Sequence, residues 1–295
     1  MSSSKIRGLT IGIWGTLGYR LPKPLAIGTS PGKPNGCITA LLEVKDLSIR
    51  FGGITALDGV SFSVQQGEIL SIIGPNGAGK TCVFNCITRI YNPTSGSIEF
   101  MGQDLLRLRP HQIISQGVAR TFQNLELFNT MTVLENLLVG QHSDLRYNIL
   151  DAIFRLPKAL RHESAGNSRA LEVLELLGLD SVKDIPTGAL PYSVKKRVEM
   201  ARALVSGPQL LLLDEPAGGL THEEVIALAG FIRQIRDGQK VTVLLVEHRM
   251  SLVMEVSDRV CVLDFGRKIA DGPPQEVRQD PAVIQTYLGA TVADA

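Results

Sequence analysis

The first chemistry that the sequence indicates is phosphate binding. The pattern G-x-x-x-x-G-K-[ST] is met by Gly74, Pro75, Asn76, Gly77, Ala78, Gly79, Lys80 and Thr81. Glycines let backbone N–H groups turn toward phosphate oxygens, and the helix that follows directs its positive end at the same charge. Lys80 is expected to reach the β and γ phosphates of a bound nucleotide, and the hydroxyl of Thr81 to bind Mg²⁺.

A pair of acids after four leucines supplies a second chemical group. Asp214 and Glu215 follow the run Leu210-Leu211-Leu212-Leu213. A buried strand of this kind would deliver Asp214 to the metal shell and place Glu215 one residue further, where its carboxylate could polarise water. The alternative is a plain strand end, which is the commoner meaning of such a pair in isolation.

The elements that must position these groups are those of an α/β fold. The nearly continuous apolar run Glu68 to Ile73 predicts a buried strand that leads into the phosphate-binding loop and a helix. Leu210 to Leu213 and Val241 to Val246 predict two further core strands, separated by a helix from about Glu223 to Arg236. Alternation of apolar and polar residues over 42–49 and 60–64 predicts an antiparallel edge sheet.

The remaining chain is expected to add helices. A polar stretch from about Thr130 to Gly188 includes the helical pattern 168–177, which Gly178 should end. We therefore predict an inserted α-helical subdomain over residues 124–188. Val260 to Leu263 predicts a late strand, and 281–288 a terminal helix.

Composition limits the class of protein. With 295 residues, of which 44% are hydrophobic, the chain can bury a large core, and its net charge of +1 gives no signal for nucleic-acid binding. Its cysteines (Cys37, Cys82, Cys86, Cys261) lack CxxC spacing, which favours reduced thiols in a cytosol. The longest apolar runs fall far short of the roughly 18 residues of a membrane span, so membrane attachment is expected to go through partners.

We predict three regions along the chain. Residues 1–40 mix Gly, Pro and Ser without period and are predicted to be a disordered extension. A signal peptide is the alternative, although glycines break its apolar part. We also hypothesise that this extension reflects the choice of start site. Residues 41–290 form the predicted ATPase domain, and 291–295 a tail.

From Leu41 to Gly289 the chain resembles the ATP-binding cassette (ABC) ATPases. The resemblance implies a P-loop NTPase (RecA-like) core with an antiparallel β edge sheet. It identifies Gln123, within Arg-Thr-Phe-Gln-Asn, as the family's Q-loop glutamine, a ligand of Mg²⁺ or of the attacking water. It also identifies His248 as the switch histidine that holds the γ phosphate, and Phe51 as the aromatic that stacks on adenine. A loop glutamine, a structural histidine and a core phenylalanine are the respective alternatives.

The resemblance further implies that two such domains face head to tail, each covering the other's nucleotide with a signature loop. Here that loop is Leu190-Pro191-Tyr192-Ser193-Val194, and Ser193 adds a Cβ where close approach to phosphate is expected. We predict that Ser193 caps the helix that follows. Cys82, Thr221 and Arg249 are smaller departures from the family pattern.

Within the family, the chain resembles the longer ATPase subunit of branched-chain amino acid importers. The resemblance rests on residues 120–128, 131–140, the insertion from Gln141 to Arg169 and residues 269–289. It implies a second ABC ATPase subunit, two transmembrane permease subunits and, indirectly, a periplasmic or surface solute-binding protein. The chain would then be peripheral, on the cytoplasmic face of the inner membrane. Urea or short-amide importers use similar subunits, and lipopolysaccharide exporters are more distant.

Alternatives remain for the docking surface and for the class of protein. Leu125, Leu127, Phe128 and Met131 could form an apolar groove for a membrane subunit or pack the subdomain core. A soluble cassette ATPase of DNA repair or translation and a weakly hydrolysing regulatory half of a heterodimer are the rival classes. In the predicted mechanism Glu215 is the base, His248 and Gln123 position the reactants, and Lys80 with Mg²⁺ offsets charge.

Overall fold

The computed structural model describes residues 40–141 and 157–293. The predicted extension, apart from Ala40, and residues 142–156 of the predicted insertion lie outside this description. The strands are β1 (Leu42–Phe51), β2 (Ile54–Val64), β3 (Ile69–Ile73), β4 (Ser95–Phe100), β5 (Gln103–Asp104), β6 (Val118–Arg120), β7 (Leu210–Asp214), β8 (Thr242–Val246), β9 (Arg259–Asp264) and β10 (Arg267–Gly272).

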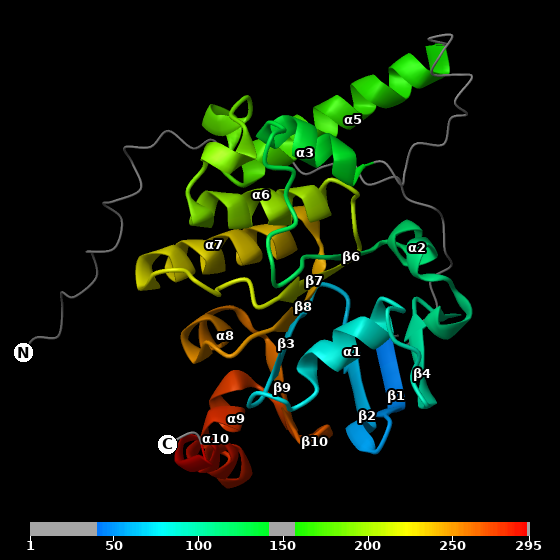
Figure 1. The fold of residues 1–295 in the computed structure, drawn as a ribbon, viewed down its shortest axis with the longest axis vertical. Coiled ribbons are helices and arrows are strands. Elements are labelled where there is room, and N and C mark those ends of the chain that lie inside the picture. The colour runs from blue at the N-terminus through cyan, green and yellow to red at the C-terminus, as the bar shows by residue number, and fades with distance from the viewer. Residues whose placement is uncertain (1–39, 142–156, 294–295) are drawn as a thin grey trace, which may run out of the picture. The chain divides into compact units, whose positions relative to one another are not determined.

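The α-helices follow the same numbering as Figure 1. They are α1 (Lys80–Ile87), α2 (Pro110–Ile113), α3 (Val133–Gly140), α5 (Pro157–Leu176), α6 (Tyr192–Leu204), α7 (His222–Gln239), α8 (Met250–Val256), α9 (Pro274–Gln279) and α10 (Pro281–Ala293). Short 3₁₀ turns occupy Leu105–Arg107, Ile114–Gln116, Asp180–Val182 and Thr187–Ala189. None of the helices that the structure describes is long and apolar enough to span a membrane.

The larger sheet has the strand order β10-β9-β3-β8-β7-β6. Its strands pair in parallel except for β10, which runs antiparallel to β9. Five consecutive buried residues in each of β3, β7 and β8 explain why the sequence showed continuous apolar runs there. In a parallel sheet the carboxyl ends of the strands share one edge, and the loops after β3, β7 and β8 therefore meet.

Alternating residues of β7 and β8 face two separate cores. Leu211 and Leu213 pack into the cluster that contains α6 and α7, whereas Leu210 and Leu212 pack into the cluster that contains α1 and β1. Figure 1 shows α6 and α7 on one side of these strands and α1 on the other. Each face of the sheet is thus covered, as an α/β fold requires.

The smaller sheet has the order β2-β1-β4-β5 and is antiparallel throughout. This confirms the predicted antiparallel sheet. The predicted terminal helix is also present, although α10 continues to Ala293, past the predicted end of the domain at residue 290.

The helices expected between residues 124 and 188 are α3 and α5, and α3 packs against both α5 and α6. The capping box of Thr132 and Glu135 fixes the start of α3. The segment 121–132 connects this helical layer to β6 at the edge of the larger sheet. It therefore carries Gln123 between the sheet and the helices.

Candidate nucleotide site

The phosphate-binding loop runs from the end of β3 to the start of α1, as predicted. Gly74, Gly77 and Gly79 have φ values of 150°, 81° and 95°. An added Cβ on Gly74 would lie 2.1 Å from the carbonyl oxygen of Leu263, and one on Gly79 would lie 2.6 Å from that of Ala56. Both glycines are thus required by the close approach of neighbouring backbone, while Gly77 faces open space within 4 Å.

Lys80 is folded back onto the loop. Its ammonium donates to the carbonyl oxygens of Gly74 at 2.8 Å and Pro75 at 2.9 Å, and the residue is 6% exposed. Burial lowers the pKa of Lys80, against the opposing effect of Glu215 and Asp214. The loop thus holds a buried cation at the place where phosphate charge is expected.

The remaining loop residues differ in exposure. Asn76, Gly77 and Thr81 are exposed, Pro75 and Cys82 are half-buried, and Ala78 is buried. Burial raises the pKa of Cys82 and raises that of Cys86 to about 12, which disfavours thiolates at neutral pH. Neither Cys82 nor Cys86 is therefore expected to act as a reactive thiol.

Asp214 ends β7, in the position predicted for a metal ligand, and its carboxylate is engaged. It accepts a hydrogen bond from Arg120 of β6 at 2.6 Å, and both side chains are at least nine-tenths buried. Arg120 also donates to Asn85 of α1 and to Thr88, the residue that follows α1. Arg120 lies in the predicted Q-loop segment, but no motif in the sequence indicated this role for it.

The predicted catalytic residues meet at Glu215. The amide nitrogen of Gln123 donates to Glu215 Oε2 at 3.1 Å, and Nδ1 of His248 lies 3.8 Å from the same oxygen. These three residues come from the loops after β6, β7 and β8. Glu215 has φ of 46°, which is uncommon outside glycine and is found at functional sites. Their catalytic roles stay predictions.

Glu247 is a supporting residue that no sequence motif identified. It is fully buried, and its carboxylate accepts from the backbone N–H groups of His248, Arg249 and Ala217. The carboxylate therefore ties the loop that carries His248 to the loop after Glu215. The signal available in the sequence was an acid directly after an apolar strand and directly before the histidine.

Phe51 lies at the end of β1 and is 45% exposed, which excludes the core alternative. Its ring meets that of Tyr91 edge to face, with centroids 5.0 Å apart. The exposed Phe51 ring, supported by the half-buried Tyr91, offers a surface on which a planar base could stack.

The prediction that Ser193 caps a helix was wrong. α6 begins at Tyr192, and Pro191 with φ of −57° occupies the N-cap position without a side-chain hydrogen bond. Ser193 lies inside the first turn instead. The pKa of Glu224 is lowered by hydrogen bonds from the Thr221 backbone and from the Ser193 hydroxyl, so Ser193 is linked to the start of α7.

The side chains beside the phosphate-binding loop offer the few oxygen ligands that a magnesium ion takes from a protein, and not a complete set of metal ligands. Among the described residues, no group of three or more His, Cys, Asp and Glu could hold a metal ion. The donors near the loop are oxygen atoms of Thr81, Asp214 and Gln123, and Mg²⁺ accepts few protein oxygens because it keeps waters and phosphate oxygens. Which of these donors bind the ion stays a prediction.

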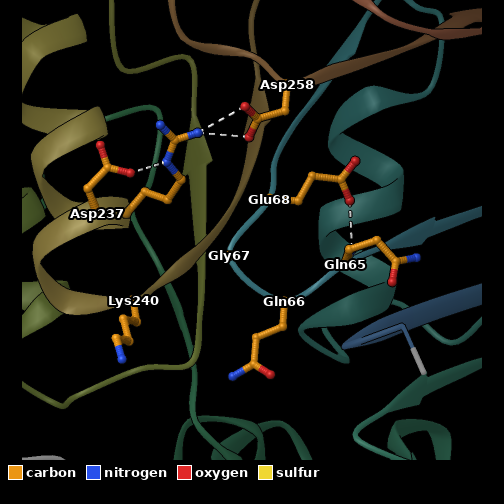
Figure 2. Close-up of a pocket in the computed structure, with 8 residues that line it drawn as sticks. Gln65, Gln66, Gly67, Glu68, Asp237, Lys240 and Asp258 are labelled. Atoms are coloured by element: carbon orange, nitrogen blue, oxygen red, sulfur yellow. Dashed lines mark hydrogen bonds and ion pairs between the residues drawn. The ribbon is translucent and has the colours of Figure 1, made fainter. Parts of the chain in front are cut away.

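A pocket of about 680 Å³ lies at the amino ends of strands in the larger sheet, away from the phosphate-binding loop. Its lining residues include Glu68, Lys240 and Asp258, which stand just before β3, β8 and β9. Arg236 donates to Asp258 and to Asp237 (Figure 2). Asp237 and Asp258 are thus already paired with the same cation, Arg236. The phosphate-binding loop lies at the other ends of these strands.

Comparisons with known proteins agree with this geometry. Residues 57–218 match the family of ABC transporters, and residues 267–293 match a family described as branched-chain amino acid ATP-binding cassette transporter. The high-affinity branched-chain amino acid transport ATP-binding protein BraF of Pseudomonas aeruginosa is 45% identical over 84% of this chain and 98% of its own length. The corresponding LivG of Escherichia coli is 44% identical over the same shares.

Solved structures give the same fold. An ATP-binding cassette of an ABC transporter, crystallised in its ADP conformation, superposes with a TM-score of 0.75 at 32% identity, covering 85% of this chain and 99% of its own. A nucleotide-free ATP-binding cassette from an ABC transporter gives 0.73 at 31% identity, covering 84% and 99%. The nucleotide-bound relative supports ATP binding by this fold.

Proposed function

The chain belongs to the ABC transporter family, within its branched-chain amino acid group, and we propose that it hydrolyses ATP to drive branched-chain amino acid uptake through separate membrane subunits. The observation that carries the proposal is the convergence of Gln123 and His248 on Glu215, one residue after Asp214 and beside the buried Lys80. The substrate class follows from the names of the relatives, since an ATPase subunit does not itself contact the transported molecule.

In the proposed reaction, water attacks the γ phosphorus in line with the bond to ADP. Glu215 accepts the proton of that water as the new P–O bond forms, and the γ P–O bond to ADP breaks. Gln123 and His248 orient the water and the γ phosphate. Lys80 and the backbone N–H groups of the loop stabilise the negative charge on the phosphate oxygens.

We propose that Thr81, Asp214 and Gln123 hold Mg²⁺ when nucleotide is bound. The ion would neutralise charge on the phosphates. Asp214 would then exchange or share its bond with Arg120, which now occupies one of its oxygens. Phe51 would stack on adenine, with Tyr91 as its support.

The proposed assembly includes a second ABC ATPase subunit, two permease subunits and an external solute-binding protein, with this chain peripheral at the cytoplasmic face. Phe128 and Met131 are 48% and 36% exposed, which supports the docking interpretation of this apolar segment. Leu127 instead packs on the core around α6, so the segment also has a structural part.

The proposal is tested by Mg²⁺-ATP turnover of the purified chain and its Glu215→Gln variant. We expect turnover in the wild type and a loss of at least about 100-fold in the variant, because a base is removed. Affinity for ATP should be unchanged. Turnover that survives in Glu215→Gln would contradict the assigned base.

A Ser193→Gly variant separates this function from the regulatory-half alternative. Removal of the Cβ and of the link to Glu224 should raise turnover if the signature loop is weakened but competent. ATP binding without turnover in both the wild type and Ser193→Gly would instead favour a subunit that needs a different partner chain.

A further inference from the structure

Helix α6 presents a row of charged side chains to the loop that carries Gln123. Lys196, Glu199 and Arg202 are spaced by three residues and therefore lie along one side of the helix. The Lys196 ammonium donates to the Gln123 carbonyl at 3.1 Å, and the Phe122 N–H donates to Glu199 Oε1 at 3.2 Å. Arg202 donates to the Glu126 carbonyl. Three side chains on one side of α6 thus bind the backbone of the segment 122–126.

Two of these charges are held at a cost. Lys196 and Glu199 are each 3% exposed, and their charged atoms are 3.8 Å apart. A buried pair at this distance recovers only part of its desolvation cost and is weak evidence for added stability. What the pair does accomplish geometrically is to fix one backbone acceptor and one backbone donor of the 122–126 segment.

The same segment reaches the predicted base. Lys196 binds the backbone carbonyl of Gln123, and the side chain of Gln123 donates to Glu215 Oε2 at 3.1 Å. At its other end, α6 begins at Tyr192, within the stretch that corresponds to the signature loop. A continuous set of contacts therefore joins the start of α6 to Glu215.

We propose that Lys196 and Glu199 are positioning residues that hold Gln123 against Glu215 and so make the geometry of hydrolysis depend on the position of α6. The proposal rests on the ATPase function proposed above. It adds that the helix carrying the signature residues acts on the base of its own chain, through backbone contacts rather than through nucleotide.

The contacts themselves are tested by amide hydrogen exchange in the nucleotide-free full chain. Lys196→Met and Glu199→Gln should each increase exchange in a peptide covering residues 122–126, because an anchor of the segment is lost or weakened. The matched control is Lys195→Met on the same helix, since Lys195 donates to the Gly188 carbonyl and not to this segment. Exchange that is unchanged in both variants, or equally increased in the control, would overturn the proposal.

Turnover gives a second readout. For Lys196→Met we expect kcat to fall about ten- to a hundredfold, because misplacement of about an ångström has costs of this order. KM for ATP should stay close to that of Lys195→Met. The midpoint of thermal unfolding should fall, because Glu199 loses its buried partner, so kcat is compared per folded molecule at a temperature where each variant is folded. A merely structural role would lower the unfolding midpoint in the same way but leave kcat of the folded fraction unchanged.

A double-mutant cycle decides whether the effect passes through Gln123. In a Gln123→Ala background, Lys196→Met should lower kcat by no more than twofold further, since the group that it positions is already absent. Losses that multiply independently would overturn the inference while leaving the ATPase function intact. A wild-type chain without turnover would count against the proposed function, and the exchange experiment would still decide the contacts.

Discussion

Arg120 places one guanidinium among groups from three elements. It donates to Asp214 of β7, to Asn85 of α1 and to Thr88 directly after α1. Its Cζ lies 5.2 Å from the ring centre of Phe122. A buried carboxylate without such a partner would face a large desolvation cost. The metal-binding role proposed for Asp214 therefore depends on a cation that pairs with the carboxylate in its buried position.

We expect Arg120→Leu to lower the free energy of unfolding by about 3–5 kcal/mol, because it leaves the Asp214 charge buried and unpaired. Urea denaturation followed by circular dichroism measures this. The control is Arg267→Leu, which breaks the pair with Asp58 at 2.6 Å where both side chains are exposed, and it should cost no more than about 1 kcal/mol.

A second substitution tests the cause. Adding Asp214→Asn to Arg120→Leu should recover part of the lost stability, since the remaining group is then neutral. An equal or larger loss in the double variant would mean that packing of the Arg120 side chain, not its charge, accounts for the effect.

Among the individual residues, those that could be predicted from the sequence belong to a motif that places them at the end of a strand. The loop from Gly74 to Thr81 follows a strand, and Asp214 ends one, so their positions depend on few other residues. Arg120 and Glu199 could not be recognised in this way, because their burial results from packing between elements distant in sequence. The prediction that Ser193 is the N-cap was wrong for a local reason, since Pro191 occupies that position and the helix begins earlier than expected.

Among the elements, the phosphate-binding loop shows how sequence and packing combine. Gly74 and Gly77 both have φ in the range that side chains rarely adopt, but only Gly74 also lies against another strand, through the carbonyl of Leu263 in β9. The motif requires both glycines, while the structure distinguishes their reasons. Gly74 is needed for the fold of the loop, and Gly77 leaves its outer side open.

The difference can be measured in the nucleotide-free protein. Gly77→Ala should lower the free energy of unfolding by about 1 kcal/mol, from backbone strain alone. Gly74→Ala should lower it by about 3 kcal/mol or more, since a Cβ at 2.1 Å from a backbone oxygen forces β3 and β9 apart. Similar losses in the two variants would show that the loop moves freely away from β9.

Strands buried on both faces were predictable, whereas the shortest strand at the edge of the larger sheet, β6, was not. The runs that became β3, β7 and β8 are continuous because helices or the second sheet cover each face. β6 has only three residues and carries the charged Arg120, so no strand periodicity of apolar residues indicated it in the sequence. α7 runs to Gln239 rather than to about Arg236, because Gly238 lies inside the helix and Lys240 adopts the left-handed conformation that ends it.

For the molecule as a whole, the two ends of the strands in the larger sheet differ in function. The candidate chemistry lies at the carboxyl ends of β3, β7 and β8, whereas the amino ends of β3 and β9 are joined by ionic contacts. Asp258 accepts from the buried Ile69 N–H at 2.8 Å and takes two bonds from Arg236 of α7 (Figure 2). This residue therefore links β3, α7 and β9 at the edge away from nucleotide.

We expect Asp258→Ala to lower the free energy of unfolding by about 1–3 kcal/mol, because the Ile69 N–H loses its acceptor in a buried position. Asp237→Ala removes another acid bonded to Arg236, but its side chain is 65% exposed, so the loss should stay below about 1 kcal/mol. Thermal and urea unfolding measure both. Affinity for an ATP analogue at 20 °C should equal that of the wild type in both variants, because the phosphate-binding loop lies at the far ends of the same strands. Weakened nucleotide binding in folded Asp258→Ala would mean that β3 transmits a shift from its amino end to its carboxyl end. The inferred difference in function between the two ends of the strands would then be wrong.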